Sequence, residues 1–310
     1  MRLAAIDLGT NTVHVLVADA TSSEWRLVHH DQVVTRLGEG LWPTGRLHDV
    51  PMTRTEDAIA RYVEHARALG AASVRIVATS AVREAANGSV FTQRLAARTD
   101  TAVEVVSGEE EARLTLRGVM DGLGNPRGAL LVFDVGGGST EYTVARDGAL
   151  ETTVSLVLGV VPLAERFPFP TRVEAERYRD MAEVVTTQLA RELPQTITAA
   201  TFDQLVGTAG TVTALAALDL GLPRYDGQRV QGHRLTRGAV ERQLARLSAL
   251  TLEERGRVPC LEPARADILI PGVAIVLATM ALVGVEALVV SDAGLREGIM
   301  ADSAGRLGLS

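Results

Sequence analysis

The sequence predicts an α/β protein made of two similar halves that face each other across a cleft. Short apolar runs rich in β-branched residues alternate with segments of helical periodicity, which is the pattern of an α/β architecture. The chain has 310 residues, about twice the length of a typical single domain. Two motifs also recur in the same order and at nearly the same spacing, which indicates an internal duplication.

The duplication rests on two pairs of segments. DLGTNT at 7–12 matches DVGGGS at 134–139, and IVATSA at 76–81 matches LVGTAG at 205–210. An apolar run precedes and follows each member of the first pair, so each is predicted to be a tight turn between the two strands of a hairpin. The flanking strands are expected at Leu3–Ile6, Val13–Ala18, Leu130–Phe133 and Thr140–Ala145.

The other elements follow from periodicity and from breaker residues. Helices are expected at 55–69, 173–193, 238–250 and 273–283, and buried strands at 74–78, 103–106, 205–206 and 288–290. The richest breaker cluster is DGLGNPRG at 121–128, and we expect the domain boundary there. The first domain is then 1–121 and the second 122–310, with the last helix, about 294–308, able to pack back on the first domain.

Composition excludes several classes of protein. The net charge of -7 argues against a nucleic-acid partner. All 31 basic residues are arginine, which excludes a Walker-type phosphate loop, a protein-kinase lysine and a Schiff-base lysine. The single cysteine, Cys260, excludes an intrachain disulfide, and we interpret it as a packing residue. The chain begins with strand-like sequence, and Pro271-Gly272 interrupts its longest uncharged run, so we expect a cytoplasmic protein with no signal peptide and no membrane span.

Both glycine turns are candidate phosphate-binding loops. Glycine permits positive φ and the close approach of a ligand, and successive backbone amides form an anion nest. Asp7 and Asp134 precede the turns, and a carboxylate beside an anion nest suggests a divalent cation between carboxylate and phosphate. The alternative is two ordinary glycine turns. The candidate phosphate-binding residues are Gly9, Thr10, Asn11, Thr12, Gly136, Gly137, Gly138 and Ser139.

A third candidate loop follows the strand at 205–206. A helix is expected at 213–218, so the free amides and the positive end of the helix dipole would favour an anion here. Because the chain has no lysine, anion affinity must come from backbone groups and arginine. Arg83 could bind a phosphate bidentately, through two of its N–H groups, or it could be a solvated surface arginine. The same two interpretations apply to Arg296. The candidate residues of this loop are Gly207, Thr208, Gly210 and Thr211.

The segment SGEEEAR at 107–113 is predicted to begin a helix. Ser107 as N-cap and Glu110 three residues later form a capping box, and acidic residues in a first turn also suit the helix dipole. Glu111 lies at the edge of the buried stripe, where a carboxylate could reach a cleft. Spacing alone does not choose between Glu109, Glu110 and Glu111.

Together these segments resemble the exopolyphosphatase and guanosine pentaphosphate phosphohydrolase (Ppx/GppA) family. The resemblance is collinear and covers nearly the whole chain. Its segments are DLGTNTVH from Asp7, ATSAVREA from Ala78, SGEEEARL from Ser107, FDVGGGSTE from Phe133, GTAGT from Gly207, PGVAI from Pro271 and SDAGLREG from Ser291. The resemblance implies the actin-like superfold of sugar kinases and heat-shock chaperones, with two ribonuclease-H-like halves, and Mg²⁺-dependent (or Mn²⁺-dependent) phosphoanhydride hydrolysis.

The resemblance also implies roles for single residues. The catalytic glutamate of the family falls on Glu111, the phosphate-facing arginine on Arg83, and the metal-associated carboxylates on Asp134 and Glu141. Asp7, at the matching place in the first turn, is a third candidate metal ligand. The phosphate loops of the family fall on 9–12 and 136–139.

The chain departs from long members of the family, which carry an added C-terminal helical region. The sequence ends soon after SDAGLREG, which puts in doubt both the binding of long polyphosphate chains and their processive hydrolysis. We expect hydrolysis of the terminal phosphoanhydride of inorganic polyphosphate with release of orthophosphate. Hydrolysis of guanosine pentaphosphate, an ATP-dependent kinase of the same superfold, and a regulator that binds polyphosphate or alarmone without catalysis are the alternatives. The resemblance also suggests a homodimer.

Overall fold

The computed structural model describes residues 1–21 and 25–308, and these residues form two compact units. Unit 1 consists of Met1–Gly118 and Gly294–Ser310, and unit 2 of Val119–Ala293. The boundary expected after residue 121 differs from the observed division, because the helix α5 (Gly108–Gly122) continues to the start of the breaker cluster and the chain divides within it. The segment from Gly294 belongs to unit 1.

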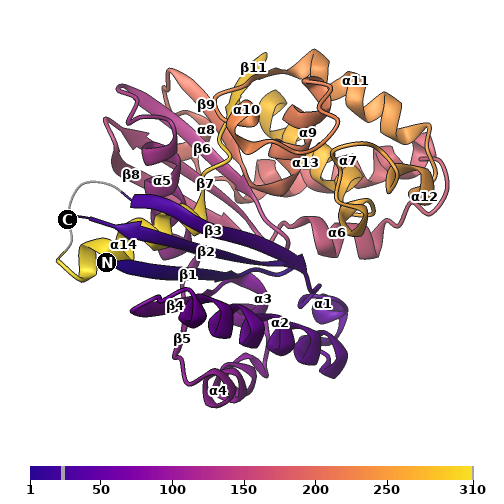
Figure 1. Cartoon of the computed structure of the whole chain (residues 1–310). Coiled ribbons are helices and arrows are strands. Elements are labelled where there is room, and N and C mark those ends of the chain that lie inside the picture. Colours follow the sequence, from indigo (N-terminus) through magenta and orange to yellow (C-terminus); the bar gives the residue numbers. More distant parts are fainter. Residues whose placement is uncertain (22–24, 309–310) are drawn as a thin grey trace. The chain divides into compact units, whose positions relative to one another are not determined.

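Unit 1 contains a five-stranded sheet of mixed direction (Figure 1). Its strands are β1 (Arg2–Leu8), β2 (Thr12–Ala20), β3 (Trp25–Val34), β4 (Ser73–Ala78) and β5 (Val103–Val105). Their order is β3-β2-β1-β4-β5. The pairs β1–β2 and β2–β3 are antiparallel, whereas β4 and β5 continue the sheet parallel to β1.

Unit 2 contains a six-stranded sheet that repeats this topology. Its strands are β6 (Ala129–Val135), β7 (Thr140–Arg146), β8 (Ala149–Leu156), β9 (Gln204–Thr208), β10 (Arg234–Thr236) and β11 (Ala287–Val290). The order β8-β7-β6-β9-β11 has the same pattern of antiparallel and parallel pairs as the sheet of unit 1, and β10 adds an antiparallel edge. This match confirms the α/β class and the duplication into ribonuclease-H-like halves; the shared cleft stays a prediction.

The helices follow the strands in both units. In unit 1 they are α1 (Leu41–Thr44), α2 (Asp49–Ala68), α3 (Ser80–Glu84), α4 (Gly88–Thr99), the greater part of α5, and α14 (Leu295–Arg306). In unit 2 they are α6 (Val160–Arg166), α7 (Ala175–Glu192), α8 (Gln195–Thr198), α9 (Ala209–Asp219), α10 (Gly227–Val230), α11 (Arg237–Ser248), α12 (Leu252–Arg255) and α13 (Leu269–Leu282).

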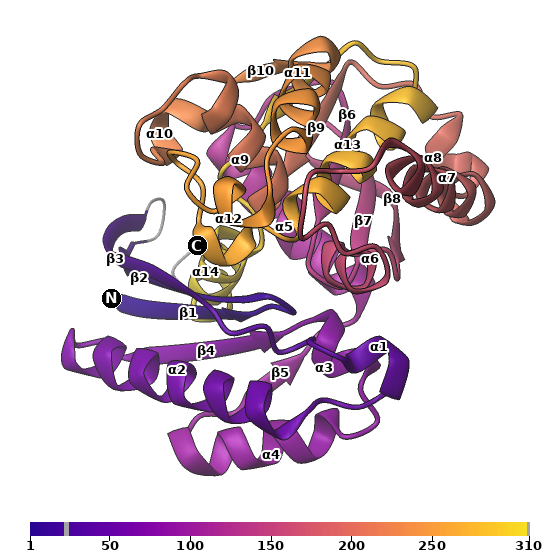
Figure 2. The same ribbon diagram turned by 90° about the vertical axis from the view of Figure 1, so that its right-hand side faces the viewer.

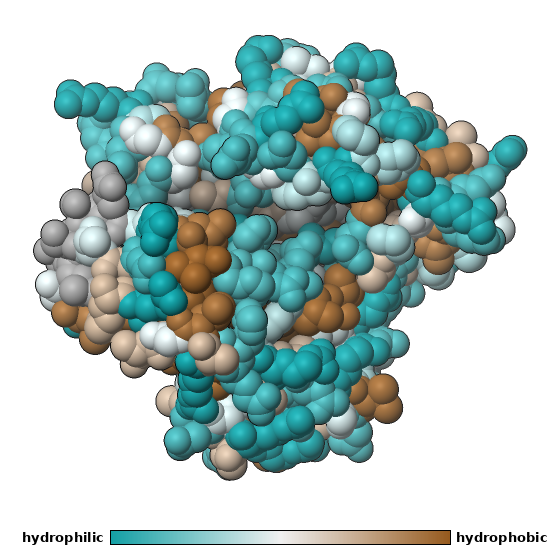
Figure 3. All heavy atoms as spheres, in the orientation of Figure 1, coloured by the Kyte–Doolittle hydropathy of each residue, from teal (hydrophilic) through white to brown (hydrophobic). Residues whose placement is uncertain are grey.

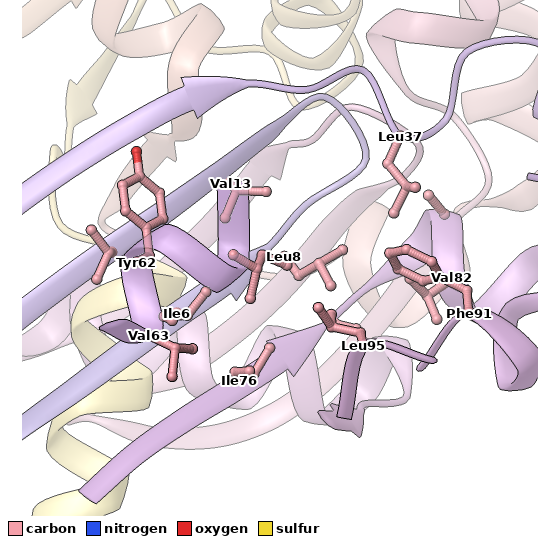
Figure 4. Close-up of a cluster of buried hydrophobic side chains, with 14 of the residues drawn as sticks. Ile6, Leu8, Val13, Leu37, Tyr62, Val63, Ile76, Val82, Phe91 and Leu95 are labelled. Atoms are coloured by element: carbon pink, nitrogen blue, oxygen red, sulfur yellow. The ribbon is translucent and has the colours of Figure 1, made fainter. Parts of the chain in front are cut away.

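The sheet of unit 1 is covered on both faces. Successive side chains of a strand point to opposite faces, so Ile6 and Leu8 join one apolar cluster while Leu3 and Ala5 join another. Figure 4 shows the first cluster, to which α2 and α4 contribute side chains such as Tyr62. The second cluster contains residues of α5 and α14, and α14 contacts β1, β2 and β4 (Figure 2). Burial on both faces explains why β1 is almost wholly apolar.

Two helices of unit 2 begin earlier than the sequence predicts. The helix α13 begins at Leu269 and includes Pro271 and Gly272, because proline is tolerated in a first turn, where the amides have no partner within the helix. The helix α9 begins at Ala209 and not at Thr213, so the predicted loop is partly the first turn of a helix. Among the described residues, no helix combines the length and the apolarity that a bilayer crossing requires. Hydrophilic side chains cover most of the face shown in Figure 3.

The helices α5 and α14 approach each other at backbone distance in unit 1. A Cβ at Gly298 would lie 1.8 Å from the carbonyl oxygen of Leu114, and a Cβ at Gly118 would lie 2.0 Å from that of Gly294. Neither contact can be relieved by a side-chain rotation, because each partner is backbone. Gly298, the last residue of SDAGLREG, therefore has a packing role, which sets how closely α14 lies on the helix that carries the glutamates of SGEEEAR.

The substitution Gly298→Ala is expected to destabilise the protein by about 1–3 kcal/mol, because the added methyl group must push the two helices apart. Gly305→Ala in the same helix is the matched control. Its Cβ would meet only the tip of Arg117 at 3.7 Å, so the better helix propensity of alanine should leave stability unchanged or raise it. Thermal unfolding of the two variants measures this, and equal melting temperatures would contradict the packing role.

Candidate active site

The two glycine turns have the same structure. Each links the strands of a hairpin, as predicted, and each is closed by one hydrogen bond: the Gly9 amide donates to the Thr12 carbonyl at 3.1 Å, and the Gly136 amide to the Ser139 carbonyl at 2.9 Å. A Cβ at either glycine would lie within 3 Å of that carbonyl oxygen. Positive φ, which glycine permits, is not used here, because the glycines of these turns are not among the residues with positive φ. Glycine is required here for close approach.

The carbonyl groups of both turns are bound by the segment that follows the third strand of each sheet. In unit 1, the Thr35 amide donates to the Asn11 carbonyl at 3.0 Å and the Gly38 amide to the Thr10 carbonyl at 2.9 Å. In unit 2, the amides of Val160 and Val161 donate to the carbonyls of Gly136 and Gly137 at 3.2 and 2.9 Å. The same arrangement therefore holds both turns.

These bonds determine where the turn amides point. In a trans peptide the carbonyl group and the following amide point in opposite directions, and the structure contains no cis peptide in its described part. The amides of Asn11, Gly137 and Gly138 therefore point away from the segments that bind the carbonyls. Within the described ranges these three amides donate to no protein group. Both units thus present backbone donors of the kind that bind phosphate oxygens.

The predicted carboxylates occupy equivalent places on the two hairpins. Asp7 lies opposite His14 in the register of β1 and β2, and Asp134 lies opposite Glu141 in the register of β6 and β7. Facing residues of an antiparallel pair have neighbouring side chains, so Asp134 and Glu141 form a carboxylate pair. Glu141 is buried and accepts a hydrogen bond from the Ser155 hydroxyl at 2.7 Å.

The Asp7 carboxyl group is not satisfied by the protein. Its Oδ1 atom is buried and, among the described residues, has no hydrogen-bond partner. Burial raises the pKa of Asp7 to about 7; nearby Arg296 opposes this shift and Glu297 adds to it. The SDAGLREG motif thus brings both of these charged groups into the surroundings of Asp7 within unit 1. An unpartnered buried carboxyl oxygen needs a proton or a cation.

In each unit taken by itself, the carboxyl groups fit a magnesium ion whose coordination is completed by substrate and water. No group of three or more His, Cys, Asp or Glu side chains in the described ranges is placed to hold a metal ion by itself. Mg²⁺ is commonly bound through one or two carboxylates together with substrate phosphates and water, so a closed protein cage is not required. The Asp134–Glu141 pair of unit 2 and the unpartnered Asp7 of unit 1 are suitable oxygen ligands.

Glu111 and Arg83, predicted as catalytic residues, form an ion pair in unit 1. Arg83 Nη1 donates to Glu111 Oε2 at 2.9 Å and to the Val106 carbonyl at 3.0 Å. Glu111 is 8% exposed. The Ser107 hydroxyl accepts from the Glu110 amide at 3.1 Å, which confirms Ser107 as the cap and fixes Glu111 in the first turn of α5. The reciprocal bond of the predicted capping box is not made in the described part of the chain, because the Glu110 carboxylate binds Arg113 instead. Arg83 therefore orients the carboxylate of Glu111.

The structure distinguishes the three glutamates that spacing left open. Glu109 is exposed, and the Glu110 carboxylate accepts two hydrogen bonds of 2.7 Å from Arg113 on the next turn. Of the three, Glu111 alone is buried. Its partner Arg83 lies on a different helix, so its position is set by tertiary structure. Glu111 is the best-positioned general base of unit 1.

An arginine that the sequence did not reveal lies against the third predicted loop. Gly210 lies in the first turn of α9, and a Cβ there would meet Arg265 Nη1 at 2.1 Å, so glycine makes room for a guanidinium. Burial lowers the pKa of Arg265. The two threonines have partners inside unit 2: Thr208 donates to the Ala293 carbonyl at 3.2 Å, and Thr211 packs against Gly272.

Gly207 and Ala209 also have structural roles in the same segment, one in packing and one in backbone conformation. A Cβ at Gly207 would lie 2.9 Å from the ring of Phe133, so this glycine allows the loop to pack on β6. Ala209 has a φ of 70°, which is left-handed and costs a residue with a side chain about 1–2 kcal/mol. Such local strain is concentrated at functional sites. No residue spacing in the sequence indicated the place of Arg265.

Comparison with known proteins gives the family to which the chain is similar. A profile of the Ppx/GppA phosphatase family matches residues 16–307. The chain is 34% identical to exopolyphosphatase 2 of Mycobacterium tuberculosis, over 98% of this chain and 99% of that protein. It is 29% identical to exopolyphosphatase 1 of Mycobacterium bovis, over 97% of this chain and 87% of that protein.

Two solved structures show the same similarity. The crystal structure of the Ppx/GppA family member of Aquifex aeolicus is 30% identical and superposes with a TM-score of 0.83, covering 100% of this chain and 99% of that one. An exopolyphosphatase from Cytophaga hutchinsonii is 25% identical and has a TM-score of 0.91, covering 99% of this chain and 98% of that one.

The raised pKa of Asp7 predicts a pH-dependent stability. The unfolded carboxyl group has a pKa near 3.9. Between that value and the folded pKa of about 7, the folded protein holds a proton that the unfolded chain has lost. Stability therefore falls as the pH rises through this range, by up to about 4 kcal/mol. Asp7→Asn has no such proton, so its melting temperature relative to the unsubstituted protein should increase from pH 4.5 to pH 8.

Thermal unfolding in metal-free buffer across this pH range measures the effect. Asp49→Asn, at an exposed position of the same unit, is the control and should follow the unsubstituted protein at every pH. A difference between Asp7→Asn and the unsubstituted protein that stays constant with pH would contradict the assignment.

Proposed function

Because the chain belongs to the Ppx/GppA phosphatase family, we propose that it is an exopolyphosphatase, which hydrolyses the terminal phosphoanhydride of inorganic polyphosphate and releases orthophosphate. The observation that carries the proposal is the buried Glu111, held by Arg83, in a unit that also contains an amide-lined turn and an unpartnered carboxyl group. Two relatives at 34% and 29% identity bear the name exopolyphosphatase. This favours polyphosphate over guanosine pentaphosphate as the substrate.

The chain's own residues supply binding and general base catalysis. The amides of Asn11, Gly137 and Gly138 donate to phosphate oxygens, and they need no reorganisation because their carbonyl groups are already bound. Bound Mg²⁺ would neutralise charge on those oxygens, with Asp134, Glu141 and Asp7 as its carboxylate ligands.

Glu111 positions a water molecule and accepts its proton as the water oxygen attacks the terminal phosphorus. A new P–O bond forms to the water oxygen, and the bridging P–O bond breaks. The shortened polyphosphate leaves with the electron pair of that bond. Arg83 holds the carboxylate of Glu111 in one orientation during this step.

The proposal is tested by phosphate release from a polyphosphate length series and from guanosine pentaphosphate, with and without Mg²⁺. We expect release from polyphosphate without ATP, dependence on the metal ion, and a lower specificity constant for guanosine pentaphosphate. Faster hydrolysis of the nucleotide would make the chain a guanosine pentaphosphate phosphohydrolase. Tight polyphosphate binding without any release would make it a regulator, and a requirement for ATP and an acceptor would make it a kinase.

The substitution Glu111→Gln is expected to reduce turnover of polyphosphate by about 10²–10⁴-fold, because the amide cannot accept the proton of the attacking water. Binding of polyphosphate should persist, since the backbone donors are unchanged. Glu109→Gln is the matched control on the same helix turn and should retain full turnover, because Glu109 is exposed. Near-normal turnover in Glu111→Gln would contradict the role of Glu111 as general base. Homodimer formation and a cytoplasmic location stay predictions from the sequence.

A further inference from the structure

Each glycine hairpin, together with the strand after it, carries a row of three facing residues at equivalent places in the two sheets. In unit 2, Asp134 on β6 faces Glu141 on β7, and Glu141 faces Ser155 on β8. The equivalent row of unit 1 is Asp7, His14 and Gln32. Both rows begin with an aspartate, but the second residue is a glutamate in unit 2 and a histidine in unit 1. The duplication therefore preserved the row while its chemistry diverged.

The row of unit 2 brings two carboxyl groups and one hydroxyl group to the same face of the sheet, because facing residues of antiparallel strands have neighbouring side chains. Glu141, in the middle, is 2% exposed, and Asp134 is half-buried. Glutamate is rarely buried to this degree unless a charge or a metal ion compensates it, and two neighbouring carboxylates repel each other. The row therefore concentrates negative charge just before the turn at 136–139.

Ser155 binds the buried carboxylate at the centre of the row. Its hydroxyl donates to Glu141 Oε1 at 2.7 Å. A glutamate side chain has three rotatable bonds, and a hydrogen bond to a charged acceptor is stronger than one between neutral groups. The bond from Ser155 therefore fixes the orientation of the Glu141 carboxylate beside Asp134. Carboxylates that bind metal ions are commonly held in this way by a hydrogen-bond partner that does not itself touch the metal.

The neighbouring row on the same face shows what an ordinary pair of hydroxyl residues does in this sheet. Thr143 and Thr153 face each other two residues along the strands, and their hydroxyl oxygens are 2.9 Å apart. Thr153 also donates to the Tyr142 carbonyl at 3.1 Å. These bonds join neutral groups and tie β7 to β8. Ser155, on the same strand and the same face as Thr153, instead gives its hydroxyl hydrogen to a carboxylate.

We propose that Ser155 is a positioning residue for the divalent cation of unit 2, because its hydroxyl holds the Glu141 carboxylate beside Asp134 before the cation binds. This inference rests on the proposed function, which assigns Asp134 and Glu141 to the cation. Loss of an outer partner of a metal ligand typically lowers metal affinity 10–100-fold. Ser155 acts through Glu141, so its removal should change the affinity for the cation much more than turnover at a saturating cation concentration.

The experiment uses the full chain with Ser155→Ala, Ser155→Thr and, as the matched control, Thr153→Val. The dissociation constant of Mn²⁺ is measured from the electron paramagnetic resonance signal of the free ion, without substrate. The Mg²⁺ concentration that gives half-maximal phosphate release from polyphosphate and the melting temperature are measured alongside.

For Ser155→Ala we expect Mn²⁺ affinity about 10–100-fold lower and a Mg²⁺ requirement raised to a similar degree, with turnover largely restored at saturating Mg²⁺. Ser155→Thr keeps the hydroxyl group in a residue that suits a strand, so its Mn²⁺ affinity should return towards that of the unsubstituted protein. Thr153→Val should lower the melting temperature and leave Mn²⁺ affinity unchanged, because its hydroxyl group bonds only neutral groups.

Three outcomes would overturn the positioning role. They are equal Mn²⁺ affinity in Ser155→Ala and the unsubstituted protein, a loss of affinity that Ser155→Thr does not restore, and an equal loss in Thr153→Val. If the unsubstituted protein releases phosphate with Mg²⁺ in any of these cases, the proposed function stands without this role. If Ser155→Ala alone loses Mn²⁺ affinity while the unsubstituted protein releases no phosphate from polyphosphate, the proposed function fails and the positioning role stands.

Discussion

The orientation of the turn peptides is fixed through their carbonyl groups, and the phosphate binding that we propose for the turns depends on this constraint. In a glycine turn whose carbonyl groups were not bound, the amide groups could point in many directions. Here the segment after the third strand binds the carbonyl groups of Thr10 and Asn11 in unit 1, and of Gly136 and Gly137 in unit 2. The amides that follow must then point the other way. Donors fixed before the ligand arrives stabilise developing charge without reorganisation, which is the main physical advantage of an enzyme over water.

The position of Glu111, the proposed general base, depends on a second set of constraints, within unit 1. The cap at Ser107 fixes where α5 begins, and the ion pair with Arg83 fixes the direction of the Glu111 side chain. The close contact of α5 with α14 fixes the helix itself, and Asp302 on α14 strengthens this contact by accepting from Arg75 at 2.7 Å and from Arg113 at 2.9 Å. The helix α14, which begins in the last motif of the chain, therefore supports a helix that begins almost two hundred residues earlier.

The sequence predicted those parts of the protein that local patterns encode. The hairpins around DLGTNT and DVGGGS, the duplicated topology and the cap at Ser107 are properties of short segments, and the structure confirms them. The strand β3 was not predicted, because WRLVHHDQVV is half exposed and carries polar residues in its centre. The choice of Glu111 from three adjacent glutamates and the place of Arg265 beside Gly210 depend on contacts between distant elements. No local pattern contains that information, and the shared cleft stays a prediction.

Two of the proposed phosphate-binding loops also contain or adjoin a residue whose backbone conformation is unfavourable. Arg36, which follows Thr35, and Ala209, at the start of α9, both have positive φ, which costs a residue with a side chain about 1–2 kcal/mol. The buried Asp7 Oδ1 atom, which has no hydrogen-bond partner among the described residues, lies just before the turn at 9–12. A core chosen only for stability would pair or replace such a group. A carboxyl oxygen needs a proton or a cation, and a metal ion bound together with a phosphate would supply the cation. In a chain without lysine, affinity for the phosphate itself must come from backbone amides, hydroxyl groups and arginine.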